Sequence, residues 1–271
     1  MSGPLDPHLP PHTIPAIQQF LRGHLEESGA KGVIVGLSGG VDSALVARLA
    51  RDALGPERVM GLSLPDANFP ADLRGEIRDY AASLGIGFRE IPIADAENAI
   101  ERALAPDGLD LVARGNLKAR VRMILDYTEA HARSFLVAGT GNKSEILLGY
   151  FTKYGDGGVD LLPIGDLYKS SVFELGRELS LPETVLGRPP TAGLWEGQTD
   201  EAELGFTYAF ADQVLVGLER LLEPDEIAEK LGVPLEKVEP VVRRVHANRH
   251  KRRPAPIAKL SLRTVGVDWR D

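Results

Sequence analysis

The chain has 271 residues, of which 43% are hydrophobic and 26% charged, an ordinary globular composition that excludes a disordered chain. Its formal net charge of −8 disfavours a general binder of nucleic acid or anionic membranes. The absence of cysteine excludes disulfides, Cys-ligated metal sites and the thiolate nucleophile of a glutaminase. The sequence shows neither a membrane span nor a secretory signal, so we expect a cytoplasmic protein.

The first twelve residues are rich in Pro and His and are expected to form a loose arm, followed by a helix from about Ile14 to Leu25. Strands and helices then alternate. Apolar, β-branched runs predict strands at 33–37, 58–65, 86–93 and 134–140. Helical patterns with Gly stops predict helices at 44–55, 72–85, 95–104 and 116–133. From about residue 168 onward, the sequence predicts helices at 168–180, 200–222, 224–232 and 234–248.

This alternation predicts an α/β protein with a doubly wound parallel sheet and a helical C-terminal appendage. No internal repeat or linker is visible, so we expect a single domain over residues 1–271. Ligands of such sheets bind at the carboxyl ends of the strands. Two Gly-rich segments, SGGVDS at 38–43 and GTGNKSE at 139–145, follow the first and fourth predicted strands, and therefore mark the expected site.

The SGGVDS segment has the features of an anion cradle. Its glycines allow close approach of the backbone, and the following helix directs free N–H groups at one point. Asp42 is unusual beside phosphates, but it is explained if Mg²⁺ bridges its carboxylate to them. The segment matches neither a Walker A loop nor a dinucleotide fingerprint. The simpler alternative is a Gly-rich turn with a helix cap.

The same segment resembles the pyrophosphate-binding loop of the N-type ATP pyrophosphatases. The stretches 116–123, 139–179, 188–208 and 249–256 resemble the ammonia-dependent NAD synthetases within that superfamily. The resemblance implies an adenine nucleotide alpha hydrolase-like fold. It also implies a ligase that forms a C–N bond by amidating deamido-NAD with free ammonia, through an acyl-adenylate, with release of AMP and pyrophosphate. A homodimer with sites at its interface is expected, without a nucleic-acid or membrane partner.

The resemblance also implies roles for individual residues. ATP is expected to bind Gly36, Leu37, Ser38, Gly39, Gly40, Val41, Asp42, Ser43, Thr140, Lys169 and Thr191. Deamido-NAD is expected to bind Arg120, Lys153, Asp160, His250 and Lys251. The Mg²⁺ cofactor is expected on Asp42 and Glu145. The expected catalytic residues are Asp156, which receives or polarises ammonia, together with Lys153 and Lys169.

Each of these residues also has a simpler interpretation. Glu145 could be a carboxylate favoured by the helix dipole, and residues 151–160 a plain mobile loop. Lys169 and Arg120 could be solvated side chains, and the basic run over 249–259 a solvated or nucleic-acid-binding tail. Two rival functions stay open: an N-type ATP pyrophosphatase with another acceptor, and a non-catalytic nucleotide sensor. The intact set of charged residues favours the enzyme.

Overall fold

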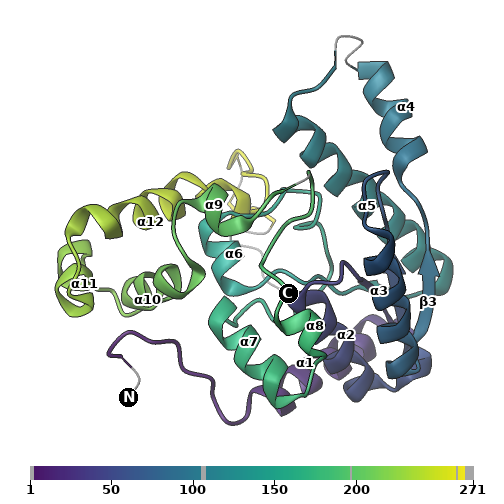
Figure 1. The fold of residues 1–271 in the computed structure, drawn as a ribbon, viewed down its shortest axis with the longest axis horizontal. Helices are drawn as coiled ribbons and strands as arrows, with labels where there is room; N and C mark the ends of the chain where they lie inside the picture. The colour runs from purple at the N-terminus through teal and green to yellow at the C-terminus, as the bar shows by residue number, and fades with distance from the viewer. Residues whose placement is uncertain (1–2, 105–107, 196, 261, 266–271) are drawn as a thin grey trace.

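The computed structural model describes residues 3–104, 108–195, 197–260 and 262–265. Four parallel strands form a sheet in the order β3-β2-β1-β4, with helices packed on both faces (Figure 1). This confirms the predicted doubly wound parallel α/β class. The strands are β1 (Val33–Gly36), β2 (Val59–Ser63), β3 (Gly87–Glu90) and β4 (Leu136–Val137).

The central strand β1 aligns the two Gly-rich segments. Val33 lies opposite Val59 of β2 on one side and opposite Leu136 of β4 on the other. The parallel pairing places the carboxyl ends of β1 and β4 at the same edge of the sheet. Both Gly-rich segments therefore leave the sheet side by side.

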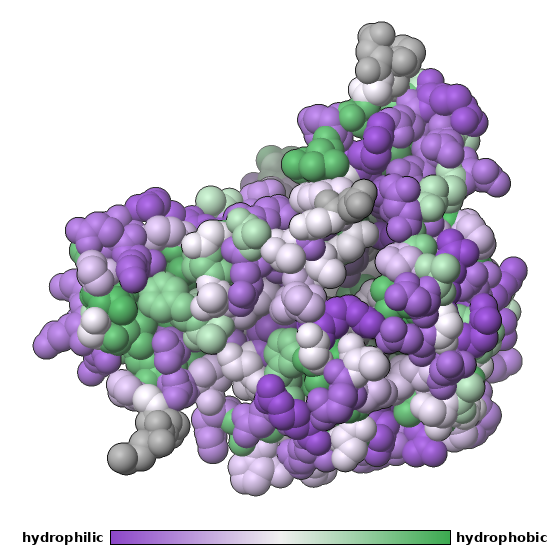
Figure 2. Space-filling view, viewed as in Figure 1, coloured by the Kyte–Doolittle hydropathy of each residue, from purple (hydrophilic) through white to green (hydrophobic). Residues whose placement is uncertain are grey.

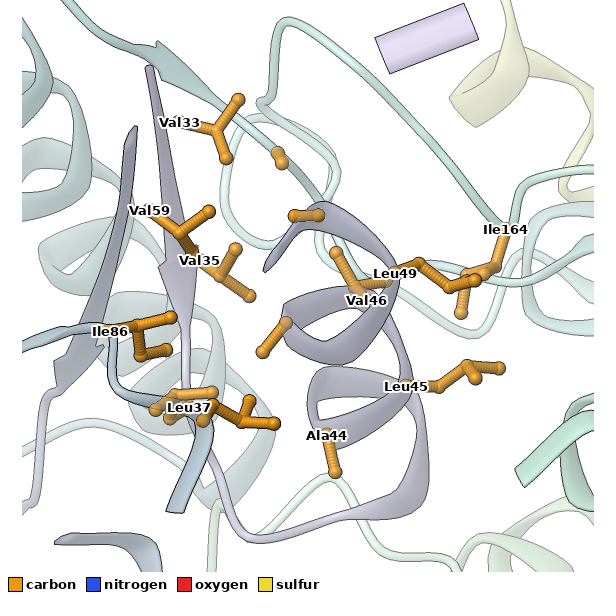
Figure 3. Packing of buried hydrophobic residues seen from close by; sticks show 14 of the residues in the cluster. Val33, Val35, Leu37, Ala44, Leu45, Val46, Leu49, Val59, Ile86 and Ile164 are labelled. Carbon is orange, nitrogen blue, oxygen red and sulfur yellow. The ribbon is translucent and has the colours of Figure 1, made fainter. Parts of the chain in front are cut away.

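One face of the sheet carries the largest apolar cluster. Alternate side chains of β1, such as Val33 and Val35, face the helix that follows, whose Leu45 and Leu49 point away from the strand, Leu49 toward Ile164 (Figure 3). A period of two on the strand and an apolar stripe on the helix produce this arrangement. The helices in this layer are α1 (Thr13–Ser28), α2 (Val41–Leu54), α3 (Ala71–Leu84), α7 (Lys169–Glu178) and α8 (Glu183–Leu186), and a 3₁₀ turn (Pro56–Arg58) joins α2 to β2.

The opposite face is covered by α4 (Ala94–Leu104) and α5 (Leu111–Arg133). Ile34 of β1, Leu62 of β2 and Val137 of β4 pack there against Val121 of α5. Helix α5 contacts both β1 and β4, the strands that precede the two Gly-rich segments.

The helices at the carboxyl end form a third apolar cluster beside the sheet (Figure 1). The expected arm contributes Leu5, which is 1% exposed within this cluster, and Asp6 accepts a hydrogen bond from Gln213 at 2.6 Å. Residues 3–12 have no helix or strand, but they are not loose throughout. The elements beyond β4 are α6 (Lys143–Leu148), α9 (Asp200–Leu204), α10 (Tyr208–Glu219), α11 (Pro224–Leu231), α12 (Leu235–Ala247) and the 3₁₀ turn η2 (Arg249–Arg252).

Two predicted elements were wrong in extent. The strand predicted over 134–140 is only Leu136–Val137, because Ser134 still ends α5 with φ +59° and Ala138 pairs with Leu161 in an isolated bridge. The helix predicted over 200–222 is two helices. Gly205 adopts φ +79° and ends α9, and the Thr207 hydroxyl caps α10 by accepting from Phe210 N at 3.2 Å.

The other predicted helices and strands are present, with ends that differ by a few residues. None of the helices within the described ranges is long and apolar enough to cross a membrane.

Candidate active site

The Gly-rich loop after β1 is held by its own hydroxyl groups. Ser43 Oγ donates to Gly40 O at 3.0 Å, and Ser38 Oγ accepts from Gly40 N at 3.3 Å. Gly39 adopts φ +82°, and a Cβ there would lie 2.5 Å from Leu73 Cδ1, so only glycine fits. The loop ends at the start of α2, whose first N–H groups have no intrahelical acceptor.

The second Gly-rich segment is joined to this loop by Asn142. Its Oδ1 caps α6 by accepting from Glu145 N at 3.0 Å, and Glu145 Oε2 accepts from Asn142 N at 3.2 Å. This reciprocal pair is a capping box. Asn142 Nδ2 also donates to Asp42 Oδ1 at 2.9 Å. The buried residue Asn142 therefore contacts both carboxylates, that of Asp42 through its side-chain amide and that of Glu145 through its backbone N–H.

Lys169, the first residue of α7, lies between these carboxylates. Its Nζ is 2.5 Å from Asp42 Oδ2 and 3.1 Å from Glu145 Oε1, and the residue is 2% exposed. Burial would lower the pKa of Lys169, but the two carboxylates outweigh it and raise that pKa. Lys169 is therefore a buried, charged ammonium and not the solvated lysine of the simpler interpretation.

The cluster brings two carboxyl groups to one ammonium. Burial raises the pKa of Glu145, and the nearby Asp42 carboxylate raises it further, although Lys169 lowers it. One ammonium thus does not balance two carboxylates in a buried site. Among the residues that the structure describes, no three His, Cys, Asp or Glu side chains gather as metal ligands. Two converging carboxylates with an uncompensated charge do fit part of a divalent cation's oxygen shell.

Tyr208 and Asp200 complete the surroundings of Lys169. The ring of Tyr208 lies under the ammonium, with Nζ 5.3 Å from the ring centroid. The Tyr208 hydroxyl donates to Asp200 Oδ2 at 3.1 Å, and both residues are buried. Because Asp200 is the first residue of α9, this contact ties the loop over 187–199 to the carboxylate cluster.

The residues expected to bind the second substrate form another group. Lys153 Nζ donates to His250 O at 2.8 Å and to Arg253 O at 2.9 Å, and the Arg120 guanidinium donates to Lys153 O at 3.3 Å. Lys251 Nζ donates to backbone carbonyls of residues 149 and 151. Burial lowers the pKa of Lys251. The structure thus joins the 151–160 loop to α5 and to η2.

Four further residues expected in the site lie in the 151–160 loop, in the 187–199 loop or near the end of β4. Asp156 accepts from Thr152 N at 2.9 Å inside the loop. Asp160 accepts from Val137 N at 2.8 Å and from the Tyr127 hydroxyl at 3.0 Å, at the end of β4. The Thr191 hydroxyl donates to Gln198 O at 2.8 Å within the 187–199 loop. Thr140 lies between β4 and the α6 cap.

Sequence reasoning missed three residues of this site. Asn142 was left without a role, although the spacing to Glu145 is that of a capping box and could have been recognised. Arg188 hydrogen-bonds the carbonyl of Gly39 and pairs with Glu76 at 2.9 Å, so it fixes the Gly-rich loop. Tyr208 and Arg188 carry no local sequence signal, because their contacts arise from folding of distant segments.

A Gly-rich turn at the carboxyl end of a strand in a parallel α/β sheet is typical of nucleotide-binding proteins. The family model for NAD synthase matches residues 13–255. An NH(3)-dependent NAD(+) synthetase of Methanosarcina mazei is 46% identical over 246 residues, 90% of this chain and 96% of its own. That of Methanococcoides burtonii is 47% identical over 254 residues, 93% of this chain and 96% of its own. The chain belongs to the NAD synthase family.

Solved structures agree with this assignment. An NMN synthetase from Francisella tularensis superposes with a TM-score of 0.81 and 33% identity, covering 94% of this chain and 100% of that one. An NH3-dependent NAD synthetase from Campylobacter jejuni gives a TM-score of 0.77 and 31% identity, covering 91% and 98%. The resemblance drawn from the sequence is therefore confirmed at the level of family and fold.

Proposed function

We propose that the protein is a ligase that converts deamido-NAD, ATP and ammonia into NAD, AMP and pyrophosphate. The observation that carries the proposal is the position of Lys169 between Asp42 and Glu145, at the junction of the two Gly-rich segments. The relatives and the solved structures that bear NAD synthetase names support the same activity.

The chemistry begins with a weak nucleophile and a polyanion. An oxygen of the nicotinate carboxylate attacks the α-phosphorus of ATP, the bond to the β-phosphate oxygen breaks, and pyrophosphate leaves. The site must offset the charge that gathers on the phosphates and hold the reactants in line. The N–H groups at the start of α2 and the Lys169 ammonium are suited to that task, with Ser38, Ser43, Thr140 and Thr191 as further ATP contacts.

Asp42 and Glu145, which converge on Lys169 Nζ, would hold Mg²⁺. When bound, the ion supplies charge neutralisation at the phosphates. Asn142 holds both residues in place, since its side chain donates to the Asp42 carboxylate and accepts from the backbone N–H of Glu145.

In the second half of the reaction, ammonia attacks the carbonyl carbon of the acyl-adenylate. A C–N bond forms, the bond from carbon to the AMP oxygen breaks, and the nitrogen gives up a proton. We assign that proton transfer to Asp156 in the 151–160 loop, which also covers the intermediate against water. Arg120, Lys153, Asp160, His250 and Lys251 are proposed contacts of deamido-NAD.

We propose that the protein is a cytoplasmic homodimer formed along α5, without a nucleic-acid or membrane partner. Leu111, Val112 and Ile124 of this helix are exposed, and Figure 2 shows an apolar patch over its start. Light scattering after gel filtration tests the dimer, since a monomeric mass at micromolar concentration would contradict it.

The first experiment is product analysis by chromatography with Mg-ATP, deamido-NAD and ammonium at mildly alkaline pH. Parallel reactions replace ammonium with glutamine, or deamido-NAD with the corresponding mononucleotide. Equal NAD and AMP from ammonium alone is the expected result. AMP formed only with the mononucleotide would assign a different acceptor, and nucleotide binding without any AMP would favour the sensor.

A further inference from the structure

Asp212 of α10 is a buried carboxylate that none of the assignments above uses. The residue is fully buried, and α10 contacts both α6 and α7 (Figure 1). Burial of a carboxylate costs free energy unless donors satisfy its oxygens. The donors to Asp212 come from the first turns of α6 and α7, the two helices that carry Glu145 and Lys169.

One oxygen of Asp212 holds the first turn of α7. Oδ2 accepts from Ser170 N at 2.9 Å and from Ser170 Oγ at 2.5 Å. Ser170 directly follows Lys169, whereas Tyr168, the N-cap residue of α7, directs its hydroxyl to Glu219 instead. The first N–H groups of a helix lack an intrahelical acceptor, so Asp212 serves as a cap supplied from another helix.

The other oxygen of Asp212 reaches Lys169 through Ser144. Oδ1 accepts from Ser144 Oγ at 2.5 Å, across 68 positions of sequence. Ser144 Oγ in turn accepts from Lys169 N at 2.9 Å. A hydroxyl can donate one hydrogen bond while it accepts another. The N–H of Lys169 and the N–H of the next residue are therefore both held from α10.

The same contacts restrain Glu145. Ser144, which precedes it in α6, is fully buried beside Asp212. The side chain of Asn142 holds the backbone N–H of Glu145 from the other side, as the cap of α6. The turn that carries Glu145 is thus fixed both by its own cap and by a carboxylate of a distant helix.

These restraints set where the Lys169 ammonium lies. Its Nζ is at the end of a flexible four-carbon chain, so the place of the ammonium depends on the place of the backbone from which it extends. The ammonium is 3.1 Å from Glu145 Oε1, and the turns that carry the two residues share Asp212 as a partner. A displacement of about 1 Å in a reacting group can cost about a hundredfold in rate.

We propose that Asp212 is a positioning residue for adenylate formation, because it sets the place of the Lys169 ammonium relative to Glu145 from outside both Gly-rich segments. The inference rests on the proposed function, in which Lys169 offsets charge at the phosphates. Asp212 acts through Ser144 and Ser170. If Asp212 only joined three helices, its loss would lower stability and leave the kinetics of the folded enzyme unchanged.

Exchange of labelled pyrophosphate into ATP, with deamido-NAD present and ammonium absent, measures adenylate formation by the full chain. Asp212→Ala removes every hydrogen bond of the carboxylate. Its exchange rate and its kcat for NAD formation are expected to fall together by about tenfold to a hundredfold. The KM for deamido-NAD is expected to change by less than about threefold, since the lost interaction acts in the transition state. Wild-type exchange in this variant would overturn the proposal.

Two milder variants cover the case in which Asp212→Ala does not fold. In Asp212→Asn the amide oxygen can accept from Ser170 N and the amide nitrogen can donate to Ser144 Oγ, so exchange is expected within about threefold of the wild type. Ser144→Ala removes the bridge to Lys169 N alone, and a loss of about threefold to tenfold is expected. A loss in Asp212→Asn as large as that in Asp212→Ala, or wild-type exchange in Ser144→Ala, would contradict positioning by these hydrogen bonds.

Glu129→Ala is the matched control for a purely structural effect. Glu129 is a buried carboxylate of α5 that accepts from Arg133 Nε at 2.8 Å and from an Arg89 nitrogen at 2.7 Å. Both alanine variants should unfold at a lower urea concentration, but only Asp212→Ala should lose exchange, measured where each protein is folded. Equal loss of exchange in the two variants would overturn the positioning role.

The wild type separates this inference from the proposed function. Absence of both exchange and NAD formation in the wild type would refute the proposed function, and the inference with it. An active wild type whose Asp212 and Ser144 variants exchange pyrophosphate at the normal rate would refute the inference alone.

Discussion

Asn142 Nδ2 donates a hydrogen bond to Asp42 Oδ1 at 2.9 Å, across 100 positions of sequence. The same side chain caps α6 through Glu145 N. The two carboxylates of the candidate metal site are thus spaced by one neutral amide that reaches both Gly-rich segments. The amide suits this position because it donates to a carboxylate and accepts from a backbone N–H at once.

Replacement of Asn142 by Leu is the direct test of this link. The variant keeps the size of the side chain but removes the cap and the hydrogen bond to Asp42. We expect NAD formation to fall by roughly tenfold to a hundredfold and the free energy of unfolding by about 1–3 kcal/mol. Steady-state kinetics and urea denaturation measure the two effects.

The matched control is Asn248→Leu. The side-chain amide of Asn248 donates to two backbone carbonyls, Leu148 O at 3.0 Å and Arg244 O at 3.1 Å. The change should cost stability with a much smaller loss of kcat. Equal loss of kcat in both variants would mean that Asn142 acts through general stability alone.

Local signals in the sequence account for most of the fold. The apolar runs around Val33 and Val59 became central strands, since β-branched residues without polar alternation suit a buried parallel sheet. The break at Gly205 was missed because a helical pattern continued on both sides of it. The end of β4 was missed because Ala138 pairs with Leu161, a residue further along the chain, and such a contact has no local sequence signal.

The site was predictable only in part. Asp42 and Glu145 could be placed together, since both follow strands whose ends share one edge of a sheet. The position of the Lys169 ammonium between them could not be predicted, because it depends on tertiary structure. Lys169 begins α7, which is distant in sequence and packs on α2. The ring of Tyr208 beneath that ammonium depends in the same way on how α10 packs against α7.

The Lys169 ammonium neutralises part of the charge of Asp42 and Glu145. In Lys169→Met the two carboxylates face each other without a cation, so we expect a loss of about 3–5 kcal/mol in unfolding free energy without Mg²⁺. Millimolar Mg²⁺ should restore more stability to this variant than to the wild type, because the ion binds only the folded state. Activity is expected to fall at least about a hundredfold.

Lys143→Met is the matched control for that change. Lys143 pairs with Asp166 and Glu219, which are themselves exposed, so its loss is expected to cost about 1 kcal/mol or less and to show no special response to Mg²⁺. Urea denaturation with Mg²⁺ or with EDTA compares the variants. An identical Mg²⁺ response in all three proteins would contradict a metal site on these carboxylates.

Tyr208 contributes a ring to Lys169 and a hydroxyl to Asp200. Tyr208→Phe keeps the ring but leaves the buried carboxylate without the 3.1 Å hydrogen bond, which should cost about 1–3 kcal/mol of stability. Tyr208→Leu also removes the ring from the ammonium, so its kcat should fall further than that of the Phe variant. Urea denaturation measures the stability of the two variants and steady-state kinetics their kcat. Equal kcat values would contradict a role for the ring in catalysis.

Stability is expected to depend on pH through Asp126, whose Oδ1 is buried and has no hydrogen-bond partner among the described residues. Burial raises the pKa of Asp126 to about 7, although Arg122 lowers it. In the unfolded chain this carboxyl has a pKa of about 3.9. Between those values the folded state keeps a proton that the unfolded state loses, so the free energy of unfolding falls as pH rises.

This effect is about 2–3 kcal/mol between pH 5 and pH 8. Asp126→Asn removes the titration, so it should show a shallower decline and be about 1–3 kcal/mol more stable than the wild type at pH 8. Urea denaturation at several pH values compares the two proteins. Parallel curves would show that Asp126 keeps an ordinary pKa in the folded state, because only a proton bound differently by the two states can change the slope.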